Sequence, residues 1–431
     1  MNGRKEKRMY YSEYSRDELA AEKEKLEKQY KTIKAASLSL NMARGKPSKA
    51  QLDLSESLLT VLNNSADCHD GALDVRNYGE LMGIPAAKAY FADMLGVKSE
   101  NVFVGGSASL QLMFDLITKA WIWGLKDSPR PWCKEEKVKW LCPAPGYDRH
   151  FKITQTLGIE MLTVPMRENG PDMDIVEEMV KDPAVKGIWC VPKYSNPEGV
   201  IYSTQVIDRF THLDPAAPDF TVMWDNAYCV HEFSGDYVPF PSILCEAEKA
   251  GTQDRFYEFA STSKITFPGA GISCMACSAE NMEYIQSFLS AQIVSFDKVN
   301  QLRHVKYLQD KAHTVAFMKK HAEILRPKFA LVAETLEREL RPLGIARWSN
   351  PKGGYFVSFY AMPGTAKRII ALMKDAGVVL TGAGATYPYG IDPDDSNIRL
   401  APSFPPLEEL KTALYVFCLC VKMASLEKLL A

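Results

Sequence analysis

"FYEFASTSKITFPGAG", residues 256–271, is a stretch in which an apolar run ends, a lysine follows, and a glycine-containing turn begins. The apolar run predicts a buried strand that ends just before the lysine. Lys264 is unexpected there, because an ammonium group is costly to bury and gains nothing from an apolar strand end. Either the chain reaches the surface at Lys264, or its amine is required inside a pocket. The stretch by itself leaves both interpretations open.

Composition limits the classes of protein to which the chain can belong. It has 431 residues, 46% of them hydrophobic and 24% charged, with a formal net charge of −2. This length exceeds the usual size of one hydrophobic core and predicts two domains, or one large domain with an appendage. A near-neutral charge gives no electrostatic reason for a nucleic-acid partner, and no apolar run reaches the roughly 18–20 residues of a membrane span. We expect neither nucleic acid nor membrane as a partner.

The N-terminus and the cysteines indicate the compartment. The first 19 residues are charged and lack the apolar segment of a secretory signal. Ten cysteines are a low density, and Cys274 and Cys277 form a C-x-x-C pair inside an apolar run, without a second pair or a nearby histidine. A core strand is the favoured interpretation of this pair, while a zinc or redox role stays open. The sequence predicts a reducing, cytoplasmic location and no metal site.

Several apolar runs alternate with segments capable of forming helices. Unbroken runs of this kind are typical of strands buried on both faces of a mostly parallel sheet. The runs comprise residues 101–106, 137–147, 186–199, 220–228, 255–264 and 271–278. Before them, residues 13–35 predict a charged surface helix with one thin apolar stripe. After them come a helical stretch, a strand pair or a strand with a turn (347–361), a helix followed by a strand (365–384) and a short strand (396–404), and together these predict a separate C-terminal domain.

The chemically distinctive residues lie at or just after the ends of these runs. In sheets of this kind, ligands bind beyond the carboxyl ends of the strands. The residues concerned are Gly106, Ser107, Tyr147, Asn196, Asp225, Tyr228 and Lys264. Their shared position predicts one common site.

The chemistry of that site follows from Lys264 and Asp225. An amine that forms an imine with a carbonyl cofactor must be partly desolvated, so that it is neutral at working pH. A carboxylate facing a pyridine nitrogen keeps that nitrogen protonated and makes the ring a stronger electron sink. Asn196 and Tyr228 are suited to contact a ring hydroxyl, and Tyr147 to stack on a flat ring. A helix-opening "GGSAS" turn is suited to bind a phosphate, because its free N–H groups and the helix dipole favour anions.

Each of these residues also has a purely structural interpretation. Asp225 is in a position to cap a helix, and Asn196 with Pro197 and Gly199 is typical of a turn. Arg399 lies in the otherwise apolar "NIRLAP", where a buried guanidinium requires a partner, so a functional carboxylate is favoured.

Together, these motifs resemble those of the fold-type I pyridoxal-phosphate aminotransferases, and most closely the aspartate-aminotransferase-like subgroup called type Ic. The matching stretches cover nearly the whole chain and are "NMARGKPS" (41–48), "RNYGELMGIP" (76–85), "CPAPGYDRH" (142–150), "VPKYSNPEG" (191–199), "WDNAY" (224–228), "STSKITFPGAG" (261–271) and "NIRLAPSF" (397–404). The resemblance implies an α/β fold, in which a large domain has a mostly parallel seven-stranded sheet flanked by helices and a smaller domain is α+β. Residues 1–75 would form an N-terminal arm and part of the small domain, 76–310 the large cofactor-binding domain, and 311–431 the C-terminal small domain.

The resemblance also implies the cofactor pyridoxal 5'-phosphate and the roles of individual residues. Lys264 would bind the cofactor covalently and move the proton at the substrate Cα, while Asp225 would pair with the pyridinium nitrogen. Tyr147 would stack on the ring, and Asn196 and Tyr228 would contact its hydroxyl oxygen. The residues implied to bind the phosphate are Gly106, Ser107, Ala108, Ser261 and Ser263.

Further roles concern the substrate and a second subunit. Arg399 would bind the substrate α-carboxylate in a bidentate pair, assisted by Asn196 and the Gly45 backbone. Tyr78 would reach the phosphate of the neighbouring subunit's cofactor, which implies a homodimer. For a distal carboxylate the sequence offers four unranked cations, which are Arg44, Lys46, Arg149 and Arg303.

Two departures from the family pattern stand out. Many aminotransferases carry a phosphate-binding arginine shortly after the lysine, but "ITFPGAG" contains no cation. The familiar "NPTG" is "NPEG" here, with Glu198 expected near the surface. We expect an aminotransferase that moves an amino group from an amino acid, with aspartate the leading donor, to a 2-oxo acid such as 2-oxoglutarate. A β-lyase, a broad or aromatic aminotransferase, and a non-catalytic ligand-binding protein on the same scaffold stay open as alternatives.

Overall fold

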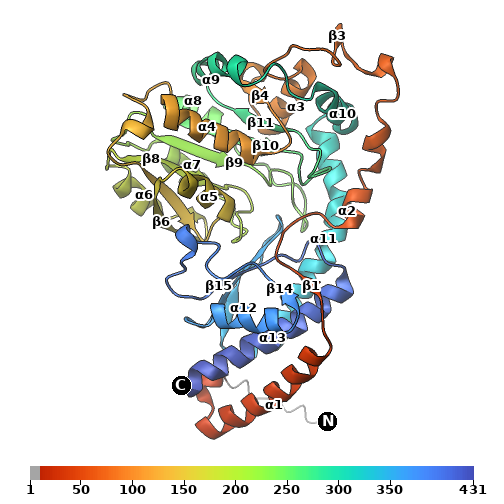
Figure 1. Cartoon of the computed structure of the whole chain (residues 1–431), viewed down its shortest axis with the longest axis vertical. Helices are drawn as coiled ribbons and strands as arrows, with labels where there is room; N and C mark the ends of the chain where they lie inside the picture. Colours follow the sequence, from red (N-terminus) through yellow and green to blue (C-terminus); the bar gives the residue numbers. More distant parts are fainter. Residues whose placement is uncertain (1–9) are drawn as a thin grey trace.

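The computed structural model describes residues 10–431 (Figure 1). Residues 1–9, the first part of the charged N-terminal stretch considered above, lie outside this range. The larger part of the molecule is built on one wide sheet, and the smaller part contains both chain ends of the described region. The long helix α11 (Lys311–Glu339) runs from one part to the other.

Within residues 10–431, the wide sheet has eight strands in the order β4-β11-β10-β9-β8-β5-β6-β7. The strands are β4 (Val102–Val104), β5 (Lys139–Ala144), β6 (Glu160–Arg167), β7 (Gly170–Pro171), β8 (Val185–Cys190), β9 (Thr221–Asp225), β10 (Phe256–Ser261) and β11 (Ser273–Ala276). The strands β10, β9, β8, β5 and β6 are parallel to their neighbours in that series, whereas β11 and the two-residue edge strand β7 are antiparallel to theirs. The predicted α/β class with a mostly parallel sheet is confirmed, with β7 as an eighth, very short strand.

Strand β6 was absent from the expected runs, and its burial explains why. Its side chains range from buried to exposed along its length, whereas all six residues of β8 are buried. Strand β6 is bordered by the two-residue β7, so part of it faces solvent and tolerates polar residues. Its sequence therefore lacks the unbroken apolar run that identified the central strands.

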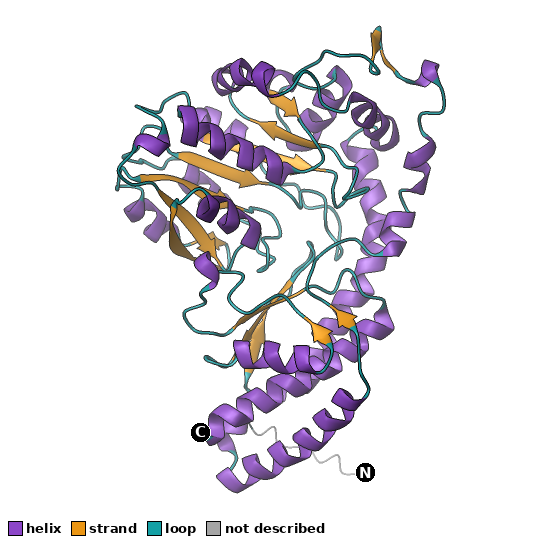
Figure 2. Ribbon diagram, in the orientation of Figure 1, coloured by secondary structure: helices purple, strands orange, loops and turns teal. Residues whose placement is uncertain are grey.

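Helices cover both faces of the wide sheet, as Figure 2 shows. One face carries a hydrophobic cluster that includes Trp224 and Phe256, and the other carries a cluster that includes Met223 and Tyr257. Residues alternate between the two clusters along each strand, as the pleat requires. The helices contributing to the first cluster are α3 (Pro85–Leu95), α6 (Met173–Met179), α7 (Thr204–Thr211), α8 (Ile243–Ala250) and α10 (Lys298–Leu308); those contributing to the second are α4 (Ser109–Trp123), α5 (Asp148–Thr156) and α9 (Ala279–Gln292).

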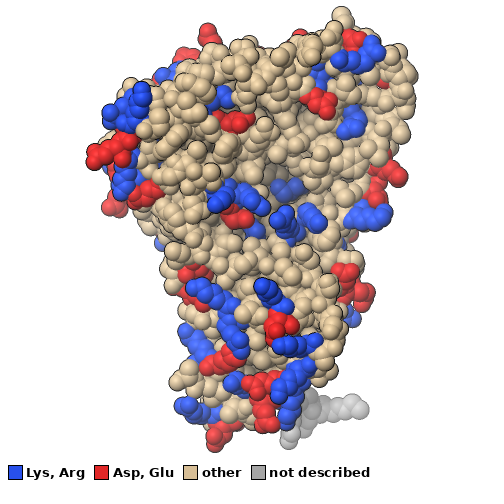
Figure 3. Space-filling model, viewed as in Figure 1, with Lys and Arg blue, Asp and Glu red and all other residues tan. Residues whose placement is uncertain are grey.

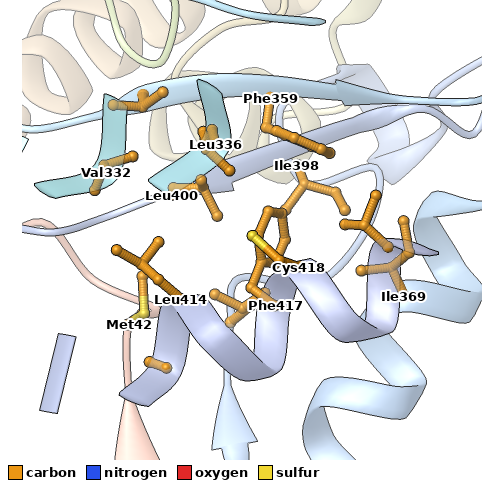
Figure 4. Close-up of a cluster of buried hydrophobic side chains, with 14 of the residues drawn as sticks. Met42, Val332, Leu336, Phe359, Ile369, Ile398, Leu400, Leu414, Phe417 and Cys418 are labelled. Carbon is orange, nitrogen blue, oxygen red and sulfur yellow. The ribbon is translucent and has the colours of Figure 1, made fainter. Parts of the chain in front are cut away.

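The smaller part has its own hydrophobic core, shown in Figure 4. In the described chain its main sheet is three-stranded and antiparallel, and α13 packs beneath it with Leu414 and Phe417 turned toward Phe359 and Leu400. Its elements are α1 (Arg16–Ala35), β1 (Leu40–Asn41), β12 (Ala346–Trp348), β13 (Val357–Ala361), α12 (Ala366–Asp375), β14 (Val378–Val379), β15 (Asn397–Leu400) and α13 (Leu407–Leu430). Three further short elements, α2 (Lys49–Asp53), β2 (His69–Asp70) and β3 (Leu73–Asp74), lie between β1 and α3.

The predicted N-terminal helix and the C-x-x-C pair both have clear structural outcomes. Helix α1 buries Leu19, Leu26 and Tyr30 along α13, which confirms the single apolar stripe.

Cys274 and Cys277 are buried in the hydrophobic clusters of opposite faces of the sheet, so the core-strand interpretation of this pair is confirmed. Among residues 10–431, no helix is long and apolar enough to cross a membrane.

Candidate active site

A cavity of about 570 Å³ lies where the carboxyl ends of the central strands meet the smaller part of the molecule. Lys and Arg side chains gather around a hollow on the face shown in Figure 3. The predicted site residues that line the cavity are Gly45, Ala108, Tyr147, Asn196, Asp225, Tyr228, Ser261, Ser263, Lys264 and Arg399. These residues come from seven separate segments of the chain, and the fold brings them together.

Three predicted residues do not line this cavity. Gly106 is partly exposed and Ser107 exposed, and their carbonyl oxygens accept hydrogen bonds from the hydroxyls of Ser273 (2.8 Å) and Ser263 (3.0 Å). The residues that face the cavity at this end are instead Ala108 and Ser109, at the first turn of α4. Tyr78 is 78% exposed on a loop outside the cavity.

Lys264 lies three residues beyond the end of β10, in the cavity wall. Its Nζ lies 4.6 Å from the centroid of the Tyr228 ring. Burial lowers the pKa of the Lys264 amine below its usual value, and the nearby Asp225 carboxylate opposes this shift. Burial also raises the pKa of the Tyr228 hydroxyl, so this group keeps its proton. The lysine is therefore a desolvated amine inside a pocket, which was one of the two interpretations of the opening stretch.

Asp225 is the last residue of β9 and is 3% exposed. Its Oδ2 lies 3.0 Å from Nε2 of His150, whereas its Oδ1 is buried without a hydrogen-bond partner among the described residues. His150 stacks on Trp189 with ring centroids 4.5 Å apart and contacts Tyr147 edge to face. The sequence prediction missed His150; the available signal was its place three residues after Tyr147, about one turn along a helix.

Arg399 lies on β15 of the smaller sheet and is 7% exposed. Its Nη1 donates to Asp148 Oδ1 (2.8 Å) and to Asn196 Oδ1 (3.3 Å), and its Nη2 donates to Thr381 Oγ1 (3.4 Å). Asp148 and Thr381 were not predicted; Asp148 lies within the motif "CPAPGYDRH", but nothing in that motif indicates that it pairs with Arg399. The buried arginine therefore has the partners that its position in an apolar strand required.

The four cations considered for a distal carboxylate separate into two groups. Arg44, Lys46 and Arg149 line the cavity, and all three are exposed. Arg303 does not line it; its Nη2 donates to the side-chain oxygen of Asn300 on the same helix.

Glu198, which was expected near the surface, is partly exposed, but its carboxylate has partners that the sequence did not predict. Its side chain is half-buried, and Oε1 accepts hydrogen bonds from the hydroxyls of Ser358 (2.5 Å) and Tyr360 (2.6 Å) on β13. Two hydroxyl donors require an acceptor between them, and a carboxylate meets that requirement. Glu198 thus joins the loop that carries Asn196 to the smaller sheet.

This fold and this cavity define a class of protein, the fold-type I aminotransferases. A family model described as aspartate aminotransferase matches residues 14–431. The aspartate aminotransferase of Corynebacterium glutamicum is 46% identical over 404 residues, which cover 94% of each chain. The chain belongs to the aspartate aminotransferase family, and it is an aminotransferase.

Solved structures agree with this assignment. A crystal structure of an aspartate transaminase from Corynebacterium glutamicum superposes with a TM-score of 0.95 at 45% identity, covering 98% of this chain and 100% of that one. The α-aminoadipate aminotransferase of Thermus thermophilus, solved with N-(5'-phosphopyridoxyl)-L-leucine, has a TM-score of 0.73 at 21% identity, covering 91% of this chain and 93% of that one. The second likeness is one of fold.

Proposed function

We propose that this aminotransferase uses pyridoxal 5'-phosphate and transfers an amino group from an amino acid, with aspartate the leading donor, to a 2-oxo acid such as 2-oxoglutarate. The observation that carries the proposal is the pair formed by Lys264 and the unpartnered Asp225 Oδ1, both at the same cavity. The name of the 46% identical relative from Corynebacterium glutamicum supports aspartate as the donor.

The residues present fit the cofactor. A buried carboxylate oxygen without a donor is costly, and a protonated ring nitrogen would supply the missing N–H. His150 stabilises the other carboxylate oxygen and so fixes the direction in which Oδ1 points. At the opposite end, the amides at the start of α4 and the hydroxyl of Ser261 suit a phosphate and would compensate for the cation missing after Lys264; the Ser263 hydroxyl would join them by turning away from the Ser107 carbonyl.

When bound, pyridoxal phosphate supplies an aldehyde carbon that takes up the amino group and a ring that withdraws electrons from the substrate Cα. The chain's own groups then have distinct tasks. Lys264 Nζ removes and returns the proton at the substrate Cα, which requires the neutral amine that its lowered pKa favours. Arg399 and Asn196 hold the α-carboxylate and so fix the orientation of the Cα–H bond, and Tyr147 covers one face of the site.

The remaining expectations are proposed on the following grounds. Tyr78 is exposed, and its loop is anchored by the buried Lys298, whose Nζ donates to the carbonyls of Asn77 and Gly79; this supports a homodimer in which Tyr78 serves the partner's site. The ten cysteines are all free, which supports a reducing, cytoplasmic location. Arg44, Lys46 and Arg149 at the cavity are the candidates for a distal substrate carboxylate.

Absorbance spectroscopy of the purified protein tests the proposal. We expect a visible band from the cofactor bound to Lys264, and loss of that band in Lys264→Ala. Addition of aspartate or glutamate alone should bleach the band in a half-reaction. A colourless protein after cofactor addition would refute the cofactor assignment. A band bleached by other amino acids, but not by aspartate or glutamate, would refute the dicarboxylate donor and favour a broad or aromatic aminotransferase, and elimination without transfer would favour a β-lyase.

A further inference from the structure

Arg399 is already paired with a carboxylate of its own chain. Among residues 10–431, Asp148 supplies the acidic group within 4.0 Å of this guanidinium, at 2.8 Å from Nη1. The two side chains come from different parts of the molecule, Asp148 from the first turn of α5 and Arg399 from β15. The ion pair therefore crosses the cavity at the place where a substrate carboxylate is expected to bind.

The pairing with Asp148 limits the number of N–H groups that Arg399 can offer to a substrate carboxylate. A terminal guanidinium nitrogen carries two N–H groups, and those of Nη1 are directed to Asp148 and Asn196. The Nε atom is buried, so the fork that faces the cavity is formed by Nη1 and Nη2. A bidentate carboxylate uses two parallel N–H groups. A substrate carboxylate can therefore accept from both Nη1 and Nη2 only if the hydrogen bond from Nη1 to Asp148 or to Asn196 is broken.

Burial indicates which of the two is released. The Asp148 side chain is 30% exposed, whereas Asn196 as a whole is 5% exposed. A carboxylate with access to solvent can regain water when it leaves the arginine, but a buried amide cannot. At the N-terminus of α5, Asp148 also keeps the favourable field of the helix dipole after it leaves.

We propose that Asp148 is an internal, displaceable ligand of Arg399 that lowers the affinity of the enzyme for the substrate carboxylate. It satisfies the buried arginine while the pocket is empty, since an unpaired buried charge is costly. The incoming carboxylate must then displace it, and the two like charges oppose one another around one guanidinium. Asp148 thereby raises the substrate KM. This inference rests on the proposed role of Arg399.

The test measures binding of succinate, a dicarboxylate without an amino group, to the holoenzyme by isothermal titration calorimetry. In Asp148→Asn and Asp148→Ala the competing charge is gone, and we expect the dissociation constant to fall by up to about fivefold, the scale of a partly exposed ion pair. Asp148→Glu keeps the charge and should bind succinate as the wild type does. In steady-state kinetics, KM should fall while kcat stays unchanged, because the lost competition affects ground state and transition state alike.

Asp174→Asn is the matched control. Asp174 also lies in the first turn of a helix and also pairs with an arginine, Arg209 at 2.6 Å, but on the surface and away from the cavity. Removal of the Asp174 charge should leave the dissociation constant of succinate unchanged. Circular dichroism establishes that each variant is folded.

The outcomes separate the inference from the proposed function. If Arg399→Lys weakens succinate binding but neither neutral Asp148 variant tightens it, Asp148 is not a competing ligand. If Asp148→Glu tightened succinate binding as much as the neutral variants do, the inference would also fail, because the tighter binding would not result from removal of the negative charge. If Arg399→Lys leaves succinate binding unchanged, the assignment of Arg399 to the substrate carboxylate fails instead.

Discussion

At the scale of single residues, Gly45 shows how an absent side chain shapes the carboxylate end of the cavity. A Cβ atom at this position would lie 2.4 Å from the ring of Phe356, which is too close for any real contact. The same ring lies against Arg399, with the guanidinium carbon 4.9 Å from its centroid. Gly45 therefore allows Phe356 to support the arginine that we assign to the substrate carboxylate.

Gly45→Ala should weaken carboxylate binding. The added methyl group must push Phe356 away from its place against Arg399, so we expect succinate to bind more weakly, and overpacking of this kind also typically costs about 1–3 kcal/mol of folding stability. Gly382→Ala is the control, because a Cβ there meets no atom within 4 Å. Calorimetry on both variants measures the effect. Equal affinities in the two would show that Phe356 does not transmit the substitution to Arg399.

At the scale of elements, strand β10 carries a buried acid, Glu258, on the sheet face opposite to that of Asp225. Glu258 pairs in register with Trp224 of β9 and Ala276 of β11, and it is 1% exposed. Its Oε1 accepts a hydrogen bond from Asn226 Nδ2 (2.9 Å), and its Oε2 has no partner among the described residues. Burial raises the pKa of Glu258 from its ordinary 4.5 to about 7.

This shift predicts a pH-dependent stability. Between pH 4.5 and about 7 the folded protein holds the Glu258 proton and the unfolded chain releases it. The resulting stabilisation is complete below pH 4.5 and is lost as pH rises through about 7, a change on the order of 3 kcal/mol. Glu258→Gln cannot ionise, so its Tm relative to wild type should rise between pH 5 and pH 8. The exposed Glu248→Gln should show no such trend, and a pH-independent difference for Glu258→Gln would contradict the raised pKa.

At the scale of the whole molecule, the cavity is formed between two hydrophobic cores that share α11. Met318 of this helix packs in a cluster beside the wide sheet, whereas Leu325 and Leu336 pack in the smaller core. The division into 1–75, 76–310 and 311–431 stays a prediction, and its boundary at 311 falls at the start of a helix that packs in both cores. Tyr78 is a proposed site residue that does not line the cavity of its own chain. In a homodimer it would contact the cofactor phosphate in the cavity of the partner subunit.

Mixed dimers test this role. A Lys264→Ala chain lacks the amine of its own site but still carries Tyr78, and a Tyr78→Ala chain keeps its own Lys264. If Tyr78 acts in the partner's site, subunit exchange between these two inactive variants restores one site in each mixed dimer, or about one quarter of wild-type activity for random pairing. Specific activity after co-refolding measures this. If activity does not exceed that of the separate variants, Tyr78 does not act across a dimer interface.

The sequence by itself determined the class of fold, the central strands and the residues at their carboxyl ends. These features are local: an unbroken apolar run predicts a buried strand, and the polar residue that ends it lies at the sheet edge. For this reason Lys264, Asp225, Asn196 and Tyr228 were predicted together, and the structure brings them to one cavity.

Only the tertiary structure decided which side chains, distant in sequence, form hydrogen bonds with the residues of the site. His150 meets Asp225 across 75 positions, Glu198 meets Ser358 across 160, and Asp148 meets Arg399 across 251. None of these pairs leaves a periodic or turn signal in the chain, because each bond depends on how the wide sheet and the smaller sheet pack. The same reason explains why the hydrogen bonds of Glu198 were not predicted: its hydroxyl donors belong to β13, which is remote in sequence and adjacent only in the folded molecule.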